Sequence, residues 1–214
     1  MRMTVVLAAV LLVGLVGCST GDDGSAERSE TSHGSATVIR TIEPVDAGGV
    51  PLPGYTARDI PTLAPLDCFT DITGGLRCSD TPDGLRFCVE AGESTAACLA
   101  DPRDTEFGLV GATLTFMTDV SPYVPAGLDL ADGSRCTLSR NPMAMATGDA
   151  QFVHVYGCTD GPTQGVYVEP LAEIGNPVRN VIDRTSDRWT VQGGDDTGPT
   201  RTVEVAVAYE LFSR

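Results

Sequence analysis

The spacing of the cysteines constrains this chain more than any other feature of its sequence. Cys68, Cys78, Cys88 and Cys98 follow one another at intervals of ten residues, and turn-forming residues lie near the middle of each interval, at 73–75, 81–85 and 92–94. Neighbouring strands of a sheet lie about 4.8 Å apart. A meander of short strands would therefore place these four cysteines side by side, within reach of disulfide bonding.

Such a meander allows two pairings of the four cysteines. The first joins Cys68 to Cys78 and Cys88 to Cys98, and the second joins Cys78 to Cys88 and folds Cys68 back onto Cys98. A flat meander favours the first pairing, because Cys68 and Cys98 would then be three strands and roughly 14 Å apart.

Cys136 and Cys158 form the simplest remaining pair. Six of the seven cysteines follow Cys18, and such an even number is typical of exported proteins that are stapled by disulfides. A zinc site is disfavoured because no CxxC spacing is present. We therefore predict three disulfides and no metal ligands, and each disulfide would stabilise the fold by about 3 kcal/mol in the chain-entropy description.

The segment from Thr81 to Leu85 predicts the shape of the middle hairpin. Pro82 at the first corner and Gly84 at the third loop position suit a three-residue loop in which Gly84 is left-handed. In that register Thr81 faces Leu85 and, counting outward, Cys78 faces Cys88.

Most of the remaining chain has the two-residue periodicity of half-buried strands. Short apolar strands are expected over 152–156 and 166–168. Alternation also predicts a strand over 110–117, with Phe116 on the apolar face, and another over 203–211. The apolar face of that last strand would consist of Val203, Val205, Val207, Tyr209 and Leu211.

One helix is expected over 176–182, because Asn176 can cap it and Pro177 suits its first position. Val178, Val181 and Ile182 would form its apolar face, with Trp189 anchoring it against the sheet. The predicted fold is a mainly β domain, an antiparallel sheet or sandwich, with one or two short helices and disulfide staples.

The beginning of the chain resembles that of a bacterial lipoprotein. An apolar run from Val5 to Val16 follows Arg2, and it is too short to span roughly 30 Å of hydrocarbon but has the size of a signal-peptide core. The run ends in Leu15-Val16-Gly17-Cys18, which resembles the lipobox of lipoproteins of the actinobacterial type. The resemblance implies a signal peptide over 1–17 and a Cys18 that carries acyl chains such as palmitate. Cys18 would hold the protein on the extracytoplasmic face of the cell membrane.

The composition after Cys18 indicates a tether. Residues 19–37 contain few large apolar side chains, so they cannot bury enough surface to offset the entropy of ordering them. The next stretch, with Pro51, Pro53, Pro61 and Pro65, should be extended and irregular. We therefore predict an anchor and tether over 18–62 and a single β-rich extracytoplasmic domain over 63–214.

The formal net charge of −15 limits the partners of the chain. Nucleic acids attract proteins chiefly through their phosphates, so an acidic chain is a poor binder of them. The sequence contains no lysine, and every basic side chain is an arginine. The predicted partners are the membrane, through the lipid anchor, and an envelope protein or an apolar ligand.

No residue is predicted to be catalytic, since the motifs of serine hydrolases, zinc proteases and nucleotide-binding proteins are absent. No cofactor is expected. His154 lies between Phe152 and Tyr156 on an expected strand, would share their face, and is interpreted as a half-buried structural residue.

Acidic residues are the other candidates for chemistry. The turn from Asp129 to Gly133 lacks the ligand spacing of a calcium loop. Asp195 and Asp196 suit a solvated turn. A carboxylate pair for glycoside hydrolysis would have to come from Glu169, Glu173 and Asp183.

The sequence is compatible with three functions. The favoured hypothesis is a non-catalytic envelope lipoprotein that presents a disulfide-stapled β domain to a protein or small ligand. A carrier of a lipid or other apolar molecule would need an enclosed apolar cavity of several hundred Å³. An envelope hydrolase would need a cleft lined by two close carboxylates, or an exposed His154 beside a serine or aspartate.

Overall fold

The structure is a computed structural model that describes residues 35–61, 64–116, 124–140, 152–168, 181–195 and 200–212. Strands account for nearly all regular structure in these residues, and the one helical element among them is the 3-10 turn η1 (Pro82–Gly84). The predicted mainly β fold, largely antiparallel, is confirmed. The strands are β1 (Val38–Ile42), β2 (Thr56–Asp59), β3 (Leu66–Thr70), β4 (Leu76–Cys78), β5 (Phe87–Glu90), β6 (Thr95–Leu99), β7 (Glu106–Thr115), β8 (Gly127–Leu130), β9 (Arg135–Leu138), β10 (Val153–Thr159), β11 (Gly165–Val168), β12 (Ile182–Asp183), β13 (Thr190–Gly194) and β14 (Arg201–Leu211).

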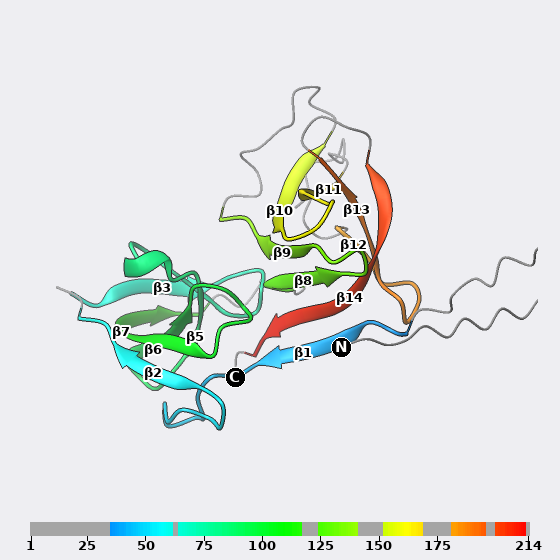
Figure 1. Cartoon of the computed structure of the whole chain (residues 1–214). Helices are drawn as coiled ribbons and strands as arrows, with labels where there is room; N and C mark the ends of the chain where they lie inside the picture. Colours follow the sequence, from blue (N-terminus) through cyan, green and yellow to red (C-terminus); the bar gives the residue numbers. More distant parts are fainter. Residues whose placement is uncertain are drawn as a thin grey trace, which may run out of the picture. The chain divides into compact units, whose positions relative to one another are not determined.

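The larger sheet has eight strands in the order β1-β14-β8-β9-β10-β11-β13-β12 (Figure 1). It closes on itself because β14 also pairs with β13. The closure uses β14 between β13 and β8, which pair with its residues 201–204 and 205–209. The eleven-residue length of β14 leaves its last residues free to pair with β1 as well. The β1–β14 pair is parallel and joins the two ends of the described chain.

The smaller sheet has six strands in the order β2-β7-β3-β4-β5-β6, and it closes through an additional pairing of β7 with β6. The long strand β7 closes the smaller sheet in the same way as β14 closes the larger one. Its residues 106–109 pair in parallel with β2, and its residues 112–115 pair in parallel with β3.

Burial on both faces of β5 and β6 explains how the two sheets are joined. One face of these strands contributes to a core shared with the larger sheet, and the other face contributes to an inner core within the smaller sheet. Alternate residues therefore belong to different cores: Phe87, Val89, Ala97 and Leu99 to the shared core, and Cys88, Ala96 and Cys98 to the inner core.

All six cysteines C-terminal to Cys18 form disulfides, and the pairing is the first of the two schemes. Cys68 bonds to Cys78, Cys88 to Cys98 and Cys136 to Cys158, each with a Cα–Cα distance of 4.0 Å. The partners face each other directly in the strand registers. The prediction of neighbouring hairpins stapled across their strands is confirmed.

The middle hairpin confirms the predicted left-handed Gly84, but not the three-residue loop or the register. Gly84 is left-handed, with a φ of 73°. Leu76, however, lies opposite Cys88, so Cys78 does not face Cys88. The prediction was wrong by two residues because the connection contains η1 and irregular residues on both sides of it, whereas a three-residue loop would continue the strands to Thr81 and Leu85.

The compact body begins earlier than the expected boundary near residue 63. One compact unit extends from Gly34 to the end of the chain, and β1 and β2 belong to its two sheets. A tether over 18–62 is therefore too long. Composition misled here because both strands are short edge strands whose residues are mostly exposed. β2 contains no large apolar side chain, and two of the three in β1, Val38 and Ile39, are half exposed.

The expected helix at 176–182 lies mainly outside the described residues. Its last residue, Ile182, belongs to β12 and pairs with Val191 of β13. Trp189 is partly buried against the shared core, with the Arg184 guanidinium 4.2 Å from its ring.

Two of the predicted strands differ in detail from the structure. Four members of the expected apolar face of β14 are buried, but a register shift between Val205 and Val207 also buries Ala208. Phe116 follows the end of β7 and is 55% exposed, so it is not part of the core.

Candidate functional site

His154 packs as a half-buried residue of β10. It lies directly opposite Tyr167 of β11, and the two ring centroids are 5.2 Å apart. A Cβ on Gly165 would lie 2.7 Å from the His154 ring, so this glycine leaves the space that the ring pair occupies.

The expectation that His154 and Tyr156 share a face is wrong. A β-bulge between them inserts Val155, which turns Tyr156 to the opposite side. Tyr156 is fully buried and donates a hydrogen bond of 2.8 Å to the carbonyl oxygen of Pro125. Burial raises the pKa of Tyr156 well above its ordinary value.

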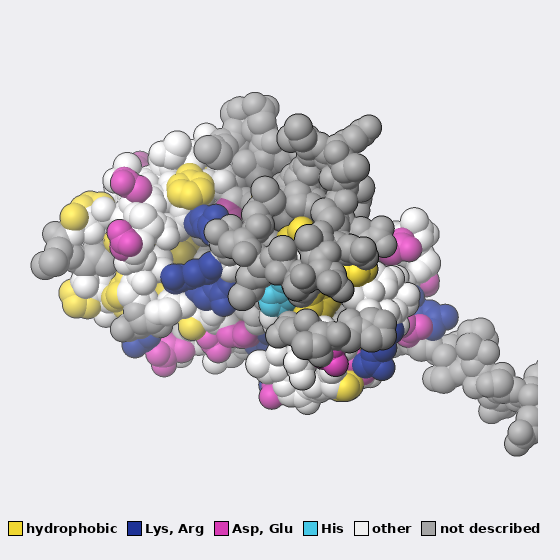
Figure 2. Space-filling model, turned by 90° about the horizontal axis from the view of Figure 1, so that it is seen from above, with side chains coloured by type: hydrophobic (Ala, Val, Ile, Leu, Met, Phe, Trp, Pro, Cys, Tyr) yellow, Lys and Arg dark blue, Asp and Glu magenta, His cyan; other side chains and the backbone are white. Residues whose placement is uncertain are grey.

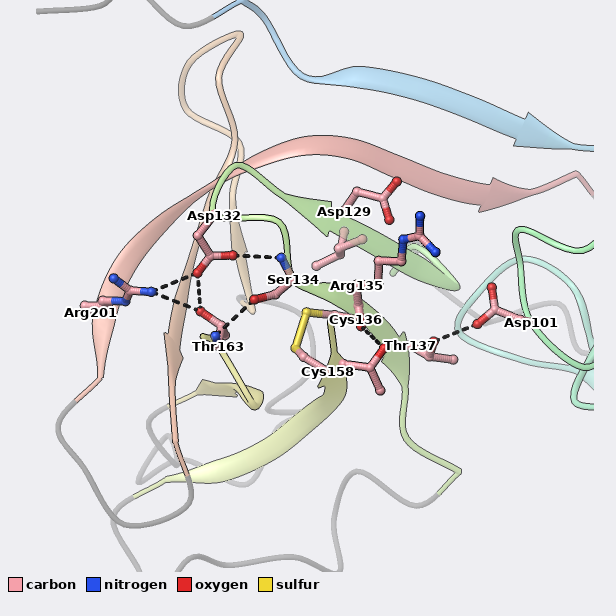
Figure 3. Close-up of a disulfide and its surroundings, with 12 residues drawn as sticks. Asp101, Asp129, Asp132, Ser134, Arg135, Cys136, Thr137, Cys158, Thr163 and Arg201 are labelled. Carbon is pink, nitrogen blue, oxygen red and sulfur yellow. Dashed lines mark hydrogen bonds and ion pairs between the residues drawn. A yellow bond between two sulfur atoms is a disulfide. The ribbon is translucent and has the colours of Figure 1, made fainter. Parts of the chain in front are cut away.

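The acidic turn after β8 is held by protein groups (Figure 3). Asp132 accepts hydrogen bonds from the Thr163 hydroxyl at 2.6 Å and the Ser134 amide at 3.0 Å, and it pairs with Arg201 at 2.8 Å. Burial alone would raise the pKa of Asp132, but these hydrogen bonds and the Arg201 charge hold it below its ordinary value. The turn is therefore a structural junction of β8, β9 and β14.

Asp129, the third residue of β8, joins the two sheets. Its carboxylate accepts hydrogen bonds from Arg103 Nε at 2.8 Å and from the Tyr209 hydroxyl at 2.7 Å. Arg103 lies in the turn between β6 and β7 and also donates to the carbonyl oxygens of Leu128 and Cys136. Desolvation would lower the pKa of Arg103, but its hydrogen bonds to Asp129 and Asp101 raise it.

The remaining predicted acidic residues form no described carboxylate pair. Asp183 is exposed on β12 and accepts a hydrogen bond from the Thr185 amide at 2.9 Å. Asp195 is exposed, and Asp196 lies outside the described residues. Glu169 and Glu173 also lie outside them, so the hydrolase hypothesis stays a prediction.

A small pocket lies where the end of β14 meets β5. Its volume is about 200 Å³, and Glu43, Glu90, Val89 and Phe212 are among the residues that line it. Ligand pockets usually occupy about 300–1,000 Å³. With two carboxylates and a small volume, this pocket does not match the enclosed apolar cavity that a lipid carrier requires.

The sulfur atoms of Cys78, Cys88 and Cys98 lie within 4.8 Å of one another. Each belongs to a disulfide, and metals bind cysteine as the thiolate, so this group is no metal site while the disulfides are intact. It marks instead the place where two disulfides adjoin in the inner core.

Three arginines and one aromatic residue form a different kind of surface, here named the arginine surface: Arg77, Arg86, Arg140 and Phe69. Arg77 on β4 and Phe69 on β3 lie directly opposite each other and share a sheet face, where Phe69 is 37% exposed. Arg86 precedes β5 and Arg140 follows β9. Figure 2 shows several dark blue side chains, all arginines in a chain without lysine, clustered on the face in view, with others further along the molecule.

Hydrogen bonds to the backbone connect the segments that carry the three arginines. Arg77 donates to the carbonyl oxygen of Arg140, and Arg86 donates to that of Leu138. Arg140 donates to the carbonyl oxygen of Leu85 at 3.3 Å. The sequence did not predict this surface because its three arginines come from separate segments, before or after different strands or within one. Only the absence of lysine drew attention to the arginines.

The lipidation candidate Cys18 lies outside the described residues. Among the residues that are described, no helix is long and apolar enough to cross a membrane. Comparison with known proteins found no matching family model, no curated protein and no solved structure.

Proposed function

We propose that this chain is a lipid-anchored extracytoplasmic protein whose β body is a non-catalytic binding module for an envelope protein or ligand. One observation carries the proposal: the chain has seven cysteines, and the three disulfides use every one except Cys18. Disulfides persist in oxidising compartments outside the cytoplasm. The cysteine that remains is the one in the lipobox-like segment.

The polar groups of the described body support a binding role better than a catalytic one. Asp129, Asp132 and Tyr156 are each engaged by protein partners in structural junctions. The arginine surface, by contrast, offers exposed cationic and aromatic groups. Aromatic residues and arginine are the types most enriched in binding surfaces.

Labelling in cells tests the anchor. Cells producing the full chain would be fed an alkyne-bearing fatty acid, and the purified protein would be examined for label and for partition into detergent. We expect the wild type and a Ser19→Ala control to carry label and Cys18→Ser to lose it. Label on Cys18→Ser, or none on the wild type, would contradict the proposed anchor.

Photo-crosslinking in intact cells tests the binding role. A photoreactive amino acid at position 69 should give a discrete crosslink that excess unmodified protein suppresses. The same group at position 93, an exposed site in the turn between β5 and β6, serves as the control. Equal crosslinking at both positions would count against a specific binding face.

A further inference from the structure

The arginine surface differs from most of the described molecule in how its charges are compensated. Of the seven other described arginines, Arg40 lies over the Tyr209 ring, 5.9 Å from its centroid. The other six form ion pairs with carboxylates: Arg58, Arg103, Arg135, Arg184, Arg188 and Arg201. Within the described ranges, Arg77, Arg86 and Arg140 form none, and their hydrogen bonds go to backbone carbonyls and to the Thr81 hydroxyl.

Like charges are held close together at this surface. Desolvation by burial lowers the pKa of Arg86, and the neighbouring Arg140 charge lowers it further, while Asp101 acts in the opposite direction. Asp101 is already engaged by Arg103, with 3.0 Å between the charged atoms. The concentration of positive charge is notable in a chain whose net charge is −15.

The three guanidinium groups also retain unused donors. A guanidinium has five N–H donors, and the hydrogen bonds described here use only one nitrogen of each. Arg86 Nε has no hydrogen-bond partner within the described structure, although it is buried. Arg77 and Arg140 are exposed, so their remaining donors face solvent, where a ligand can reach them.

We propose that Arg77, Arg86 and Arg140 form a binding site for a phosphate-type oxyanion. Exposed Arg77 and Arg140 would contact the oxyanion directly, since the guanidinium fork matches phosphate geometry. Arg86 would add positive charge beneath them. This inference names the ligand class of the binding module proposed above, and it rests on that role.

The surroundings of the site favour a compact anionic group over an extended acidic surface. Long-range repulsion from a strongly acidic protein opposes a broad anionic partner. Charges beyond the screening length of about 8 Å matter little to a small anion. Phe69, beside Arg77, offers an apolar contact for the organic part of a phosphorylated ligand.

Titration of the full chain with inorganic phosphate, followed by calorimetry and by thermal unfolding, tests the site. The wild type should bind saturably and unfold at a higher temperature with phosphate present. Arg77→Gln and Arg140→Gln should each weaken binding by about tenfold, since each removes charge-assisted hydrogen bonds. Arg58→Gln is the matched control, because Arg58 is exposed in the same sheet but paired with Glu106.

Two further measurements separate the sources of the phosphate group and the role of the arginines. Vesicles of phosphatidylcholine with and without phosphatidic acid distinguish a lipid headgroup from a soluble phosphate ester, and binding of either probe that depends on Arg77 supports the site. Arg140→Lys keeps the charge and should lose less affinity than Arg140→Gln even if both variants lose stability.

Two outcomes would overturn the site. One is the absence of saturable binding to either probe, and the other is equal weakening in Arg58→Gln. If crosslinking from position 69 persists in either case, only the ligand class is wrong and the binding role stands. If neither anion binding nor crosslinking from position 69 is observed, the proposed binding role is wrong.

Discussion

Three of the nine buried residues in the inner core of the six-stranded sheet are cysteines, and none is aromatic. The core shared with the eight-stranded sheet contains Phe87, Phe107, Tyr156 and Tyr209 and one buried cysteine, Cys136. Both sheets close through one long strand, so their topology is similar. The two cores are stabilised differently: the inner core by aliphatic residues with two adjoining disulfides, and the shared core by aromatic residues that both sheets contribute.

The difference follows from the amount of apolar surface that each core can bury. A small core removes little apolar area from water and gains correspondingly little free energy. Covalent cross-links offset this deficit by restricting the unfolded chain. We infer that the six-stranded sheet depends on its disulfides more than the eight-stranded sheet does.

Removal of one disulfide from each sheet tests this comparison most directly. Cys88→Ala with Cys98→Ala should lower the free energy of unfolding by about 4 kcal/mol, because both side chains are fully buried in the inner core. Cys136→Ala with Cys158→Ala should cost about 3 kcal/mol. Denaturant unfolding measures both.

The loop lengths make this test discriminating. The two disulfides span 10 and 22 residues, so loop entropy alone would make the second the more stabilising. A larger loss for the Cys136–Cys158 pair would therefore refute the idea that the inner core depends more on its staples.

The junction between the sheets is expected to show the next largest effect. Arg103→Leu removes the partner of Asp129 and the donor to Leu128, and should cost about 3 kcal/mol because the Arg103 side chain is only 15% exposed. Arg135→Leu is the control, since its ion pair with Asp160 is more than half exposed on both sides. That loss should stay below about 1 kcal/mol. Similar losses of unfolding free energy in the two variants would show that Arg103 does not stabilise the contact between the sheets.

Packing inside the two sheets is compared by adding one methyl group to each. In Gly108→Ala the new Cβ would lie 2.6 Å from Ile60 Cδ1 and 2.8 Å from Leu85 Cδ1, so we expect a loss of about 2 kcal/mol. In Gly157→Ala of β10 the nearest atom is the His154 Cε1 at 3.8 Å, and little loss is expected. Thermal unfolding of both variants would reveal whether the inner core is as tightly packed as these distances indicate.

The smallest effect concerns pH and is confined to the larger sheet. Because the pKa of Asp132 is lowered in the folded state, its stabilisation is present above about pH 4 and is lost as the pH falls through the lowered pKa. The difference in unfolding free energy between wild type and Asp132→Asn should therefore shrink on acidification. Glu93→Gln, at an exposed turn, controls for general charge effects. A difference that stays constant with pH would show that the carboxylate charge at position 132 contributes nothing.

Local features of this fold were predictable from the sequence. The left-handed turn at Gly84 and the two short-range disulfides of the smaller sheet depend on residues ten or fewer apart. Turn chemistry and alternation bring such residues together whatever the rest of the chain does. The alternation in the last strand likewise predicted most of its buried face.

Tertiary structure alone decided the features that join distant segments. Parallel pairing of β1 with β14 rests on backbone hydrogen bonds, which carry no side-chain signature, so the compact body began earlier than composition indicated. The arginine surface likewise combines Arg77 and Arg86 with Arg140, and the sequence places more than fifty residues between them. Local propensity acts over a few residues, whereas burial and charge act on whatever the completed fold brings together.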